Sequence, residues 1–240
     1  MRTLFTLAVA LLTTTLFAQT EINKKYPVKK GEELVLKFDY PQLVKITTWN
    51  QNEVQITGKV NINNGENDAS FKLTDQSSNN QKVIEGKVND YKSLPQRVTA
   101  EDGKEKMVFN SVKEYSAYQD KSNKKFTKTV IGAHVDIVLE IKVPKNMITK
   151  IESTYGTVEV NSFDGPLVAK STYGGVDTTI QPKQLGEITI ETFFGKVYTN
   201  VDLPLQKIKD SNFHHIVSAH IGQGPKQEYY SKYGNVYVRE

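Results

Sequence analysis

Residues 153–158 read Ser-Thr-Tyr-Gly-Thr-Val, and related phrases recur along the rest of the chain. Residues 171–176 read Ser-Thr-Tyr-Gly-Gly-Val, and residues 192–197 read Thr-Phe-Phe-Gly-Lys-Val. Residues 231–236 read Ser-Lys-Tyr-Gly-Asn-Val, and a more divergent copy, Ser-Asn-Phe-His-His-Ile, occupies residues 211–216. The aromatic residues are 18 to 21 positions apart. A repeat with a period near 20 residues is typical of stacked coils, so we expect an all-β solenoid with coils of about 20 residues.

Each copy predicts a strand, a corner and a second strand. Because side chains alternate along a strand, the ring and the hydroxyl two residues before it should share a face. The glycine after the ring permits positive φ or a tight bend. We expect rings, hydroxyls and valines to form internal ladders, so that truncating Phe194 to Ala costs about 3–5 kcal/mol. The structural repeat comprises Tyr155, Gly156, Tyr173, Gly174, Phe194, Gly195, Phe213, Tyr233 and Gly234.

Aromatic residues outside this register are the candidate binding residues, because exposed rings can contact a ligand. Two alternatives stay open: the in-register rings are exposed and bind sugars, or the off-register rings only pack against loops. The off-register candidates are Phe193, Tyr198, Tyr230 and Tyr237.

Residues 1–18 have the pattern of a signal peptide. Arg2 supplies a positive charge, residues 4–16 are largely apolar, and Ala18 is a small residue at which a signal peptidase would cut. The apolar run is shorter than the ~20 residues of a membrane span. The chain contains no cysteine, which excludes disulfides and a lipidated N-terminal cysteine. We expect an extracytoplasmic protein, periplasmic or secreted after cleavage near Ala18, without a transmembrane anchor.

The charge pattern argues against nucleic-acid binding. The 31 basic and 27 acidic residues give a formal net charge of +4. Nearly all of the basic residues are lysines interleaved with acids. A nucleic-acid interface usually gathers basic residues, arginine especially, on one surface.

The rest of the chain is also rich in strand patterns. Residues 19–134 are expected to form an N-terminal β region, in the same solenoid or packed on it, and residues 135–240 the solenoid repeats. Residues 61–128 are more polar, and they are read either as strands and loops decorating the solenoid, as a separate binding module, or as disorder. Residues 135–143 alternate as a buried strand that Pro144 ends. No useful helical period is found in the mature chain.

A strand that ends in Val143-Pro144, followed at once by hydrophobic-x-Ser/Thr-x-aromatic-Gly-x-Val units, resembles the putative-adhesin family of bacterial domains of unknown function. That family includes head-GIN-type and auto-transporter-adhesin-like domains. The match covers residues 135–240 well and 34–58 loosely, and His214 departs from it where glycine is expected. The resemblance implies a right-handed β-helix-like fold and an extracytoplasmic location, with no catalytic residues.

No motif for catalysis or for a cofactor is found, so we expect neither catalytic residues nor a cofactor. His214, His215 and His220 are close in sequence, but adjacent histidines on a strand point to opposite faces, which makes them weak candidates for a metal site. The acidic residues of the repeats occupy different positions, unlike the clustered carboxylates of polysaccharide-cleaving β-helices.

We therefore expect a non-enzymatic exported protein of the cell envelope or surface, an adhesin or a scaffold that presents a rigid body to a partner. The alternative is a carbohydrate-active β-helix that binds or cleaves an envelope or host polysaccharide. The partner would be a protein or polysaccharide of the envelope or of a host surface. An unpaired edge at residues 236–238 would also predict weak self-association.

Overall fold

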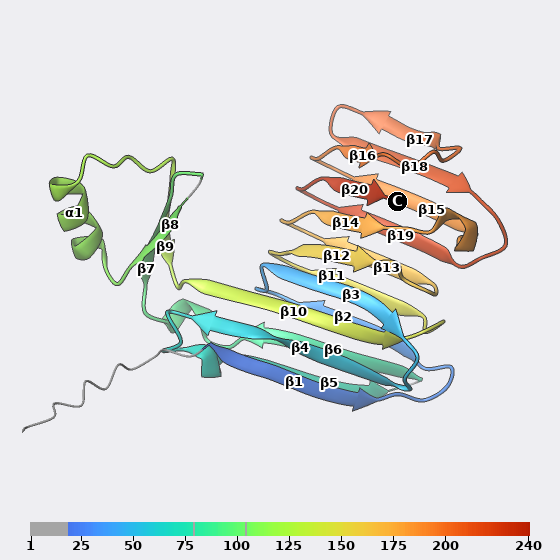
Figure 1. Ribbon diagram of the computed structural model, residues 1–240, viewed down its shortest axis with the longest axis horizontal. Coiled ribbons are helices and arrows are strands. Elements are labelled where there is room, and N and C mark those ends of the chain that lie inside the picture. The colour runs from blue at the N-terminus through green and yellow to red at the C-terminus, as the bar shows by residue number, and fades with distance from the viewer. Residues whose placement is uncertain (1–18, 79, 104) are drawn as a thin grey trace, which may run out of the picture.

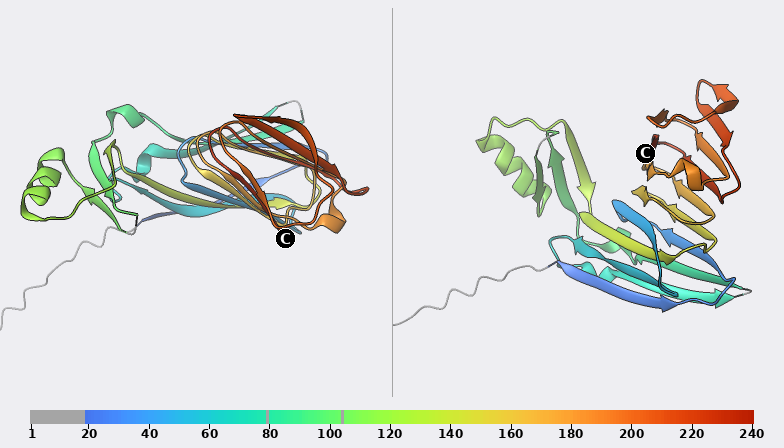
Figure 2. Two further views of the ribbon diagram at one scale, coloured as in Figure 1. Left: turned by 90° about the horizontal axis from the view of Figure 1, so that it is seen from above. Right: turned by 45° about the vertical axis from the view of Figure 1, so that its right-hand side comes forward.

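The computed structural model describes residues 19–78, 80–103 and 105–240, so the expected signal peptide lies outside the described residues. Two large β-sheets face each other, and a small third sheet projects from one side (Figure 1). Viewed from above, the strands of the repeat region follow one another in a narrow stack (Figure 2). The expected all-β class is confirmed.

The first sheet has eight strands, and their order in space differs from their order along the chain. Its central and C-terminal strands pair in parallel, whereas β1 pairs with β4, and β4 with β10, in antiparallel fashion. In spatial order the strands are β1 (Thr20–Pro27), β4 (Glu53–Ile62), β10 (Val135–Pro144), β3 (Leu43–Trp49), β12 (Thr157–Asn161), β14 (Val176–Thr179), β20 (Val236–Arg239) and β16 (Val197–Thr199).

The second sheet has nine strands and is also mixed, because antiparallel pairs occur at both of its ends. Neither large sheet is a continuous parallel stack, so the sheets do not form the expected uniform solenoid. In spatial order the strands are β17 (Gln206–Ser211), β18 (His214–His220), β15 (Glu187–Thr192), β19 (Lys226–Ser231), β13 (Leu167–Ser171), β11 (Thr149–Ser153), β2 (Glu33–Phe38), β6 (Gln81–Val88) and β5 (Phe71–Ser78).

The polar middle of the chain divides between the large sheets and the projecting arm. The arm contains β7 (Arg97–Glu101), β8 (Lys106–Phe109), β9 (Lys128–Gly132) and α1 (Val112–Lys121). Its own small core joins Val98, Ala100 and Phe109 to rings from α1. The expectation of no helix was wrong: Ser111 caps α1 by accepting a hydrogen bond from the Glu114 N–H at 3.1 Å, a standard N-terminal signal. Short 3-10 helices cover Asp68–Ser70, Tyr91–Ser93 and Pro182–Gln184.

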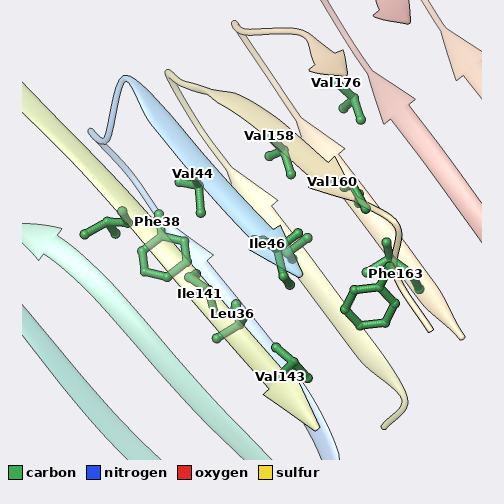
Figure 3. Packing of buried hydrophobic residues seen from close by; sticks show 14 of the residues in the cluster. Leu36, Phe38, Val44, Ile46, Ile141, Val143, Val158, Val160, Phe163 and Val176 are labelled. Atoms are coloured by element: carbon green, nitrogen blue, oxygen red, sulfur yellow. The ribbon is translucent and has the colours of Figure 1, made fainter. Parts of the chain in front are cut away.

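The main core lies between the two large sheets. It follows from alternation, because every second residue of strands such as β10 and β12 points inward. Figure 3 shows Leu36 and Phe38 from the second sheet with Val44, Val158 and Val176 from the first. All five are at most 1% exposed. The predicted valine ladder is confirmed at positions 158, 176 and 236, while Val197 and Ile216, nearer the end of the stack, are only half-buried.

The repeat copies do not stack in sequence order. The strands β19 and β20, which come last in the chain, lie between β13–β14 on one side and β15–β16 on the other. The expectation of an open solenoid end at residues 236–238 was therefore wrong, because β20 is paired on both sides. The divergent copy at residues 211–216 joins β17 and β18 as an antiparallel pair and does not form a coil.

Candidate functional site: an exposed aromatic ladder

The corner of each repeat is built around one buried hydroxyl. Ser153, the last residue of β11, accepts a hydrogen bond from the N–H of Gly156 at 3.1 Å. The hydroxyls of Ser171, Thr192 and Ser231 accept the same bond from the glycine three residues later. Such a local bond turns the chain immediately after the strand. The predicted internal hydroxyl ladder is confirmed at these four positions, each at most 3% exposed, but not at Ser211 of the divergent copy, which is exposed.

The same hydroxyls fasten each corner to its neighbour. Ser171 donates a hydrogen bond to the carbonyl oxygen of Gly156 at 2.8 Å. Ser231 donates to the carbonyl oxygen of Gly174 at 2.8 Å, and Thr192 to that of Gly234 at 2.9 Å. Each of these three hydroxyls therefore satisfies one donor and one acceptor of the backbone at once, as a buried polar group requires.

The glycines are needed for close approach between corners. A Cβ at Gly174 would lie 2.3 Å from the carbonyl oxygen of Gly156, and one at Gly195 would lie 1.9 Å from that of Gly234. None of the corner glycines has positive φ. The glycine positions were predicted correctly, but positive φ is not the reason for them.

The rings lie outside the core, contrary to expectation. Tyr155, Tyr173 and Phe194 are 53–55% exposed, Tyr233 is 45% exposed and Phe213 is 64% exposed. In the four regular copies the strand ends at the hydroxyl residue, so the ring two positions later belongs to the corner and no longer follows the alternation of the strand. The ring therefore projects from the rim of the two-sheet body.

The exposed rings stack on one another as a continuous row, here called the aromatic ladder. Tyr155 and Tyr173 have ring centroids 5.2 Å apart, the Tyr173–Tyr233 and Tyr233–Phe194 centroids are 5.1 Å apart, and these three pairs are parallel to within 10°. Phe213 follows Phe194 at 5.7 Å with a tilt of 43°. The ladder comprises, in spatial order, Tyr91, Tyr40, Tyr155, Tyr173, Tyr233, Phe194 and Phe213.

Two rings of the ladder were missed from the sequence. Tyr40 stacks on Tyr155 at 5.2 Å, and Tyr91 stacks on Tyr40 at 4.4 Å. A signal for Tyr40 existed, because it follows the end of β2 by two residues, as Tyr155 follows β11, and Phe38 pairs with Ser153. The corner at Tyr40 has Pro41 where the repeat has glycine, which concealed the match. Tyr91 comes from a 3-10 helix and carries no repeat signal.

The ladder offers both ring surface and hydrogen-bonding groups. The stacked rings of Tyr155, Tyr173, Tyr233 and Phe194 have centroids 5.1–5.2 Å apart, and these four residues are 45–55% exposed. Burial, with a contribution from Tyr155, raises the pKa of both the Tyr40 and the Tyr91 hydroxyls. These hydroxyls are neutral at physiological pH and can donate as well as accept.

The off-register aromatic candidates separate into two clusters on different sheets. Tyr198 and Tyr237 stack at 5.1 Å on the first sheet. Tyr230 of the second sheet meets Phe193 edge-on at 6.1 Å, and Phe193 stacks on His214 at 3.9 Å. Tyr198 is exposed, while the other three candidates are half-buried. The four therefore do not form one surface, and a binding role for them stays a prediction.

The histidines each contact a different group. His214 Nε2 lies 2.7 Å from Glu191 Oε1, and His215 Nδ1 lies 2.7 Å from Asp210 Oδ1. His220 is exposed at the end of β18. Among the described residues, no group of three or more His, Cys, Asp or Glu side chains is arranged to hold a metal ion.

The acidic residues of the repeats are paired with basic groups. Asp177 on the first sheet receives two hydrogen bonds from Arg239, at 2.8 and 2.9 Å. On the second sheet Glu152 pairs with Lys150 at 2.8 Å, and Asp210 with Lys207 at 2.8 Å. These carboxylates therefore lie on two sheets, and each already has a partner.

Comparison with known proteins finds two solved structures of low similarity. No family model matches the chain, and no curated protein matches it. A crystal structure of a putative cell adhesion protein from Clostridium sporogenes is 10% identical, with 92% of this chain and 99% of that chain covered and a TM-score of 0.47. For a putative adhesin from Bacteroides fragilis the identity is 10%, the coverages 92% and 97%, and the TM-score 0.29. At these values neither structure lends support to a function for this chain.

Proposed function

We propose that this chain is an exported, non-enzymatic adhesion protein that binds a polysaccharide of the cell envelope or of a host surface along its aromatic ladder. The observation that carries the proposal is the row of exposed, regularly spaced rings on a rigid body. Within the described residues no helix is long and apolar enough to cross a membrane. Export rests on the sequence pattern of residues 1–18. We also propose that the parallel strands β11 to β14 form the right-handed β-helix that the resemblance implies.

An extended polysaccharide suits the ladder for a geometric reason. The rings repeat every 5.1–5.2 Å over four successive pairs, and the rise per sugar in an extended β-1,4-linked glycan is close to this spacing. Each sugar can lie against the exposed part of one ring, while tyrosine hydroxyls bond to sugar hydroxyls. Several weak, equal contacts in one line add up to useful affinity.

The setting of the ladder favours binding over cleavage. Hydrolysis of a glycosidic bond needs two carboxyl groups about 5–9.5 Å apart across the bond. Asp39 lies beside the ladder, but its carboxylate accepts a hydrogen bond from Thr154 at 3.1 Å. Lys232 also lies beside the ladder, with its Nζ 5.3 Å from the centroid of the Tyr233 ring. The Asp39 carboxylate is thus already hydrogen-bonded, and Lys232 is a cation, which supports a non-enzymatic role.

The test is retention of the chain from Gln19 on insoluble β-1,4-linked polysaccharides, with the supernatant assayed for released sugar. We expect retention without release. Loss of retention is expected in the Tyr155→Ala/Tyr173→Ala variant, which removes two adjacent rings from the ladder. The Tyr198→Ala/Tyr237→Ala variant is the matched control, because it removes a pair stacked at 5.1 Å elsewhere on the body.

The outcomes separate the alternatives. Released sugar would replace the proposal with a carbohydrate-cleaving enzyme. Equal retention of the ladder variant and the wild type would show that the ladder is not the binding site. Loss in the control variant alone would instead favour Tyr198 and Tyr237, the sequence-based candidates.

A further inference from the structure

The segment that contains β19 and β20 fills a gap left earlier in the chain. After β14 the chain skips one position in the stack and forms β15 and β16 on the far side of that position. It then forms the β17–β18 hairpin and returns to the skipped position through residues 221–225. Figure 1 shows β19 and β20 between strands that come earlier in the chain, β13 and β14 on one side and β15 and β16 on the other. Residues 226–239 are here called the insert segment, and the position they occupy the slot.

The insert segment is held on both sides by backbone and by side chains. Its N–H groups at Lys232 and Tyr233 bond to the carbonyl oxygens of Ser171 and Thr172 at 3.0 and 2.9 Å. On the opposite side its carbonyl oxygens at Ser231 and Lys232 accept bonds from residues 193 and 194, at 3.2 and 2.9 Å. The slot is therefore a site for one strand pair with hydrogen-bonding edges on both sides.

The interior of the slot is specific for this segment. Tyr229 is 1% exposed, and its hydroxyl donates to Gln227 Oε1 at 2.6 Å. The side-chain amide of Gln227 in turn donates to the carbonyl oxygens of Phe163 and Gly165, at 2.7 and 3.2 Å. A strand with this tyrosine and glutamine in the same register satisfies these buried groups.

The strands β15 to β18 depend on the insert segment for their place in the sheets. β15 pairs with β19 and β16 with β20, and neither pairs with β13 or β14. When the insert segment is not in the slot, the edges of β13, β14, β15 and β16 are left without a partner strand. Such edges are templates for another strand.

We propose that the slot accepts the insert segment of a second copy of this chain, giving strand-exchanged dimers. The second copy provides the same register, the same tyrosine and the same corner hydroxyls, so each contact of the monomer is reproduced between chains. In a single chain the short connection keeps its own segment at a high effective concentration, so the monomer prevails in dilute solution. Exchange occurs where chains fold at high concentration. This inference is independent of the polysaccharide proposal.

The test uses the chain from Gln19 with Lys170→Cys and Tyr230→Cys. These half-buried positions pair in register across β13 and β19, within reach of a disulfide, and the natural chain has no cysteine to compete. When the disulfide is formed before unfolding, it holds the insert segment to its own chain. After unfolding and refolding at high concentration, we expect the reduced protein to yield a species of twice the monomer mass. The oxidised protein should give monomer alone.

A second experiment keeps the proposal testable if the double variant folds poorly. A chain with only Lys170→Cys is refolded together with a chain with only Tyr230→Cys, and the mixture is then oxidised. We expect a disulfide-linked heterodimer. This heterodimer should be lost when the first chain carries Lys72→Cys in place of Lys170→Cys, because Lys72 is on β5 at the far end of the same sheet. The proposal would be overturned if the reduced double variant refolded to monomer alone, or if the oxidised double variant gave as much dimer as the reduced one. It would also be overturned if the Lys72→Cys chain gave as much disulfide-linked heterodimer as the Lys170→Cys chain.

Discussion

The hydroxyl of Ser171 donates a hydrogen bond to the carbonyl oxygen of Gly156, 2.8 Å away, and so joins two corners of the stack. The Ser171 hydroxyl oxygen also accepts a bond from the N–H of Gly174 at 3.0 Å. Ser231 and Thr192 repeat this arrangement at the next two corners. Each of these corners is therefore joined to its neighbour from inside by a buried hydroxyl, while the rings outside them are about half exposed.

Removing such a hydroxyl should be costly. Ser171→Ala leaves the Gly156 carbonyl and the Gly174 N–H without their partner, so the free energy of unfolding should fall by about 1–3 kcal/mol. Ser171→Thr is the matched control, because Thr192 fills the equivalent place at another corner, and it should cost less than half as much. Urea unfolding of both variants measures the difference, and equal losses would contradict the role given to the hydroxyl.

The corner glycines should tolerate no side chain. Gly174→Ala places a Cβ 2.3 Å from a backbone oxygen, so two corners must move apart, at a cost of about 3 kcal/mol or more. Gly132→Ala is the control, because its Cβ would meet only the Tyr91 hydroxyl, at 3.4 Å, and should cost less than about 1 kcal/mol. Thermal unfolding tests this, and a similar loss in both variants would show that the stacking distance does not matter.

Ladder rings and core rings should differ in their contribution to stability. Tyr229→Ala empties a fully buried position and should cost about 3–5 kcal/mol. Tyr173→Ala removes a ring that is 55% exposed, so it should cost only about 1–2 kcal/mol. If denaturant unfolding gave the two variants equal losses, the ladder would be a structural element of the core.

The hydroxyl, glycine and valine positions of the repeat were readable from the sequence, because each is set by contacts within one corner or between equivalent corners. The ring positions were misread because β11, β13, β15 and β19 end at the hydroxyl residue, and alternation stops there. The stacking order was also unreadable. The copies at residues 171–176, 192–197 and 231–236 are so alike that the repeated phrase does not set their order in space.

Alkaline pH should destabilise the protein through Tyr229. Burial raises the pKa of its hydroxyl, so the unfolded chain releases this proton first as pH rises. This destabilisation is absent below the ordinary tyrosine pKa of about 10, and the free energy of unfolding falls as pH rises above that pKa. The difference between wild type and Tyr229→Phe isolates this residue from the other tyrosines and lysines. If the difference in free energy of unfolding between wild type and Tyr229→Phe stayed constant from pH 8 to about 11, this role of Tyr229 would be contradicted.

The most direct measurement for the central claim is the affinity of soluble β-1,4-linked oligosaccharides of increasing length, titrated against the chain from Gln19 and against Tyr155→Ala/Tyr173→Ala. If one sugar engages one ring, affinity should rise severalfold with each added sugar until the ladder is covered. The double variant should flatten this rise, because two adjacent rings in the middle of the row are gone. An affinity that is independent of length, or equal in the two proteins, would contradict polysaccharide binding along the ladder.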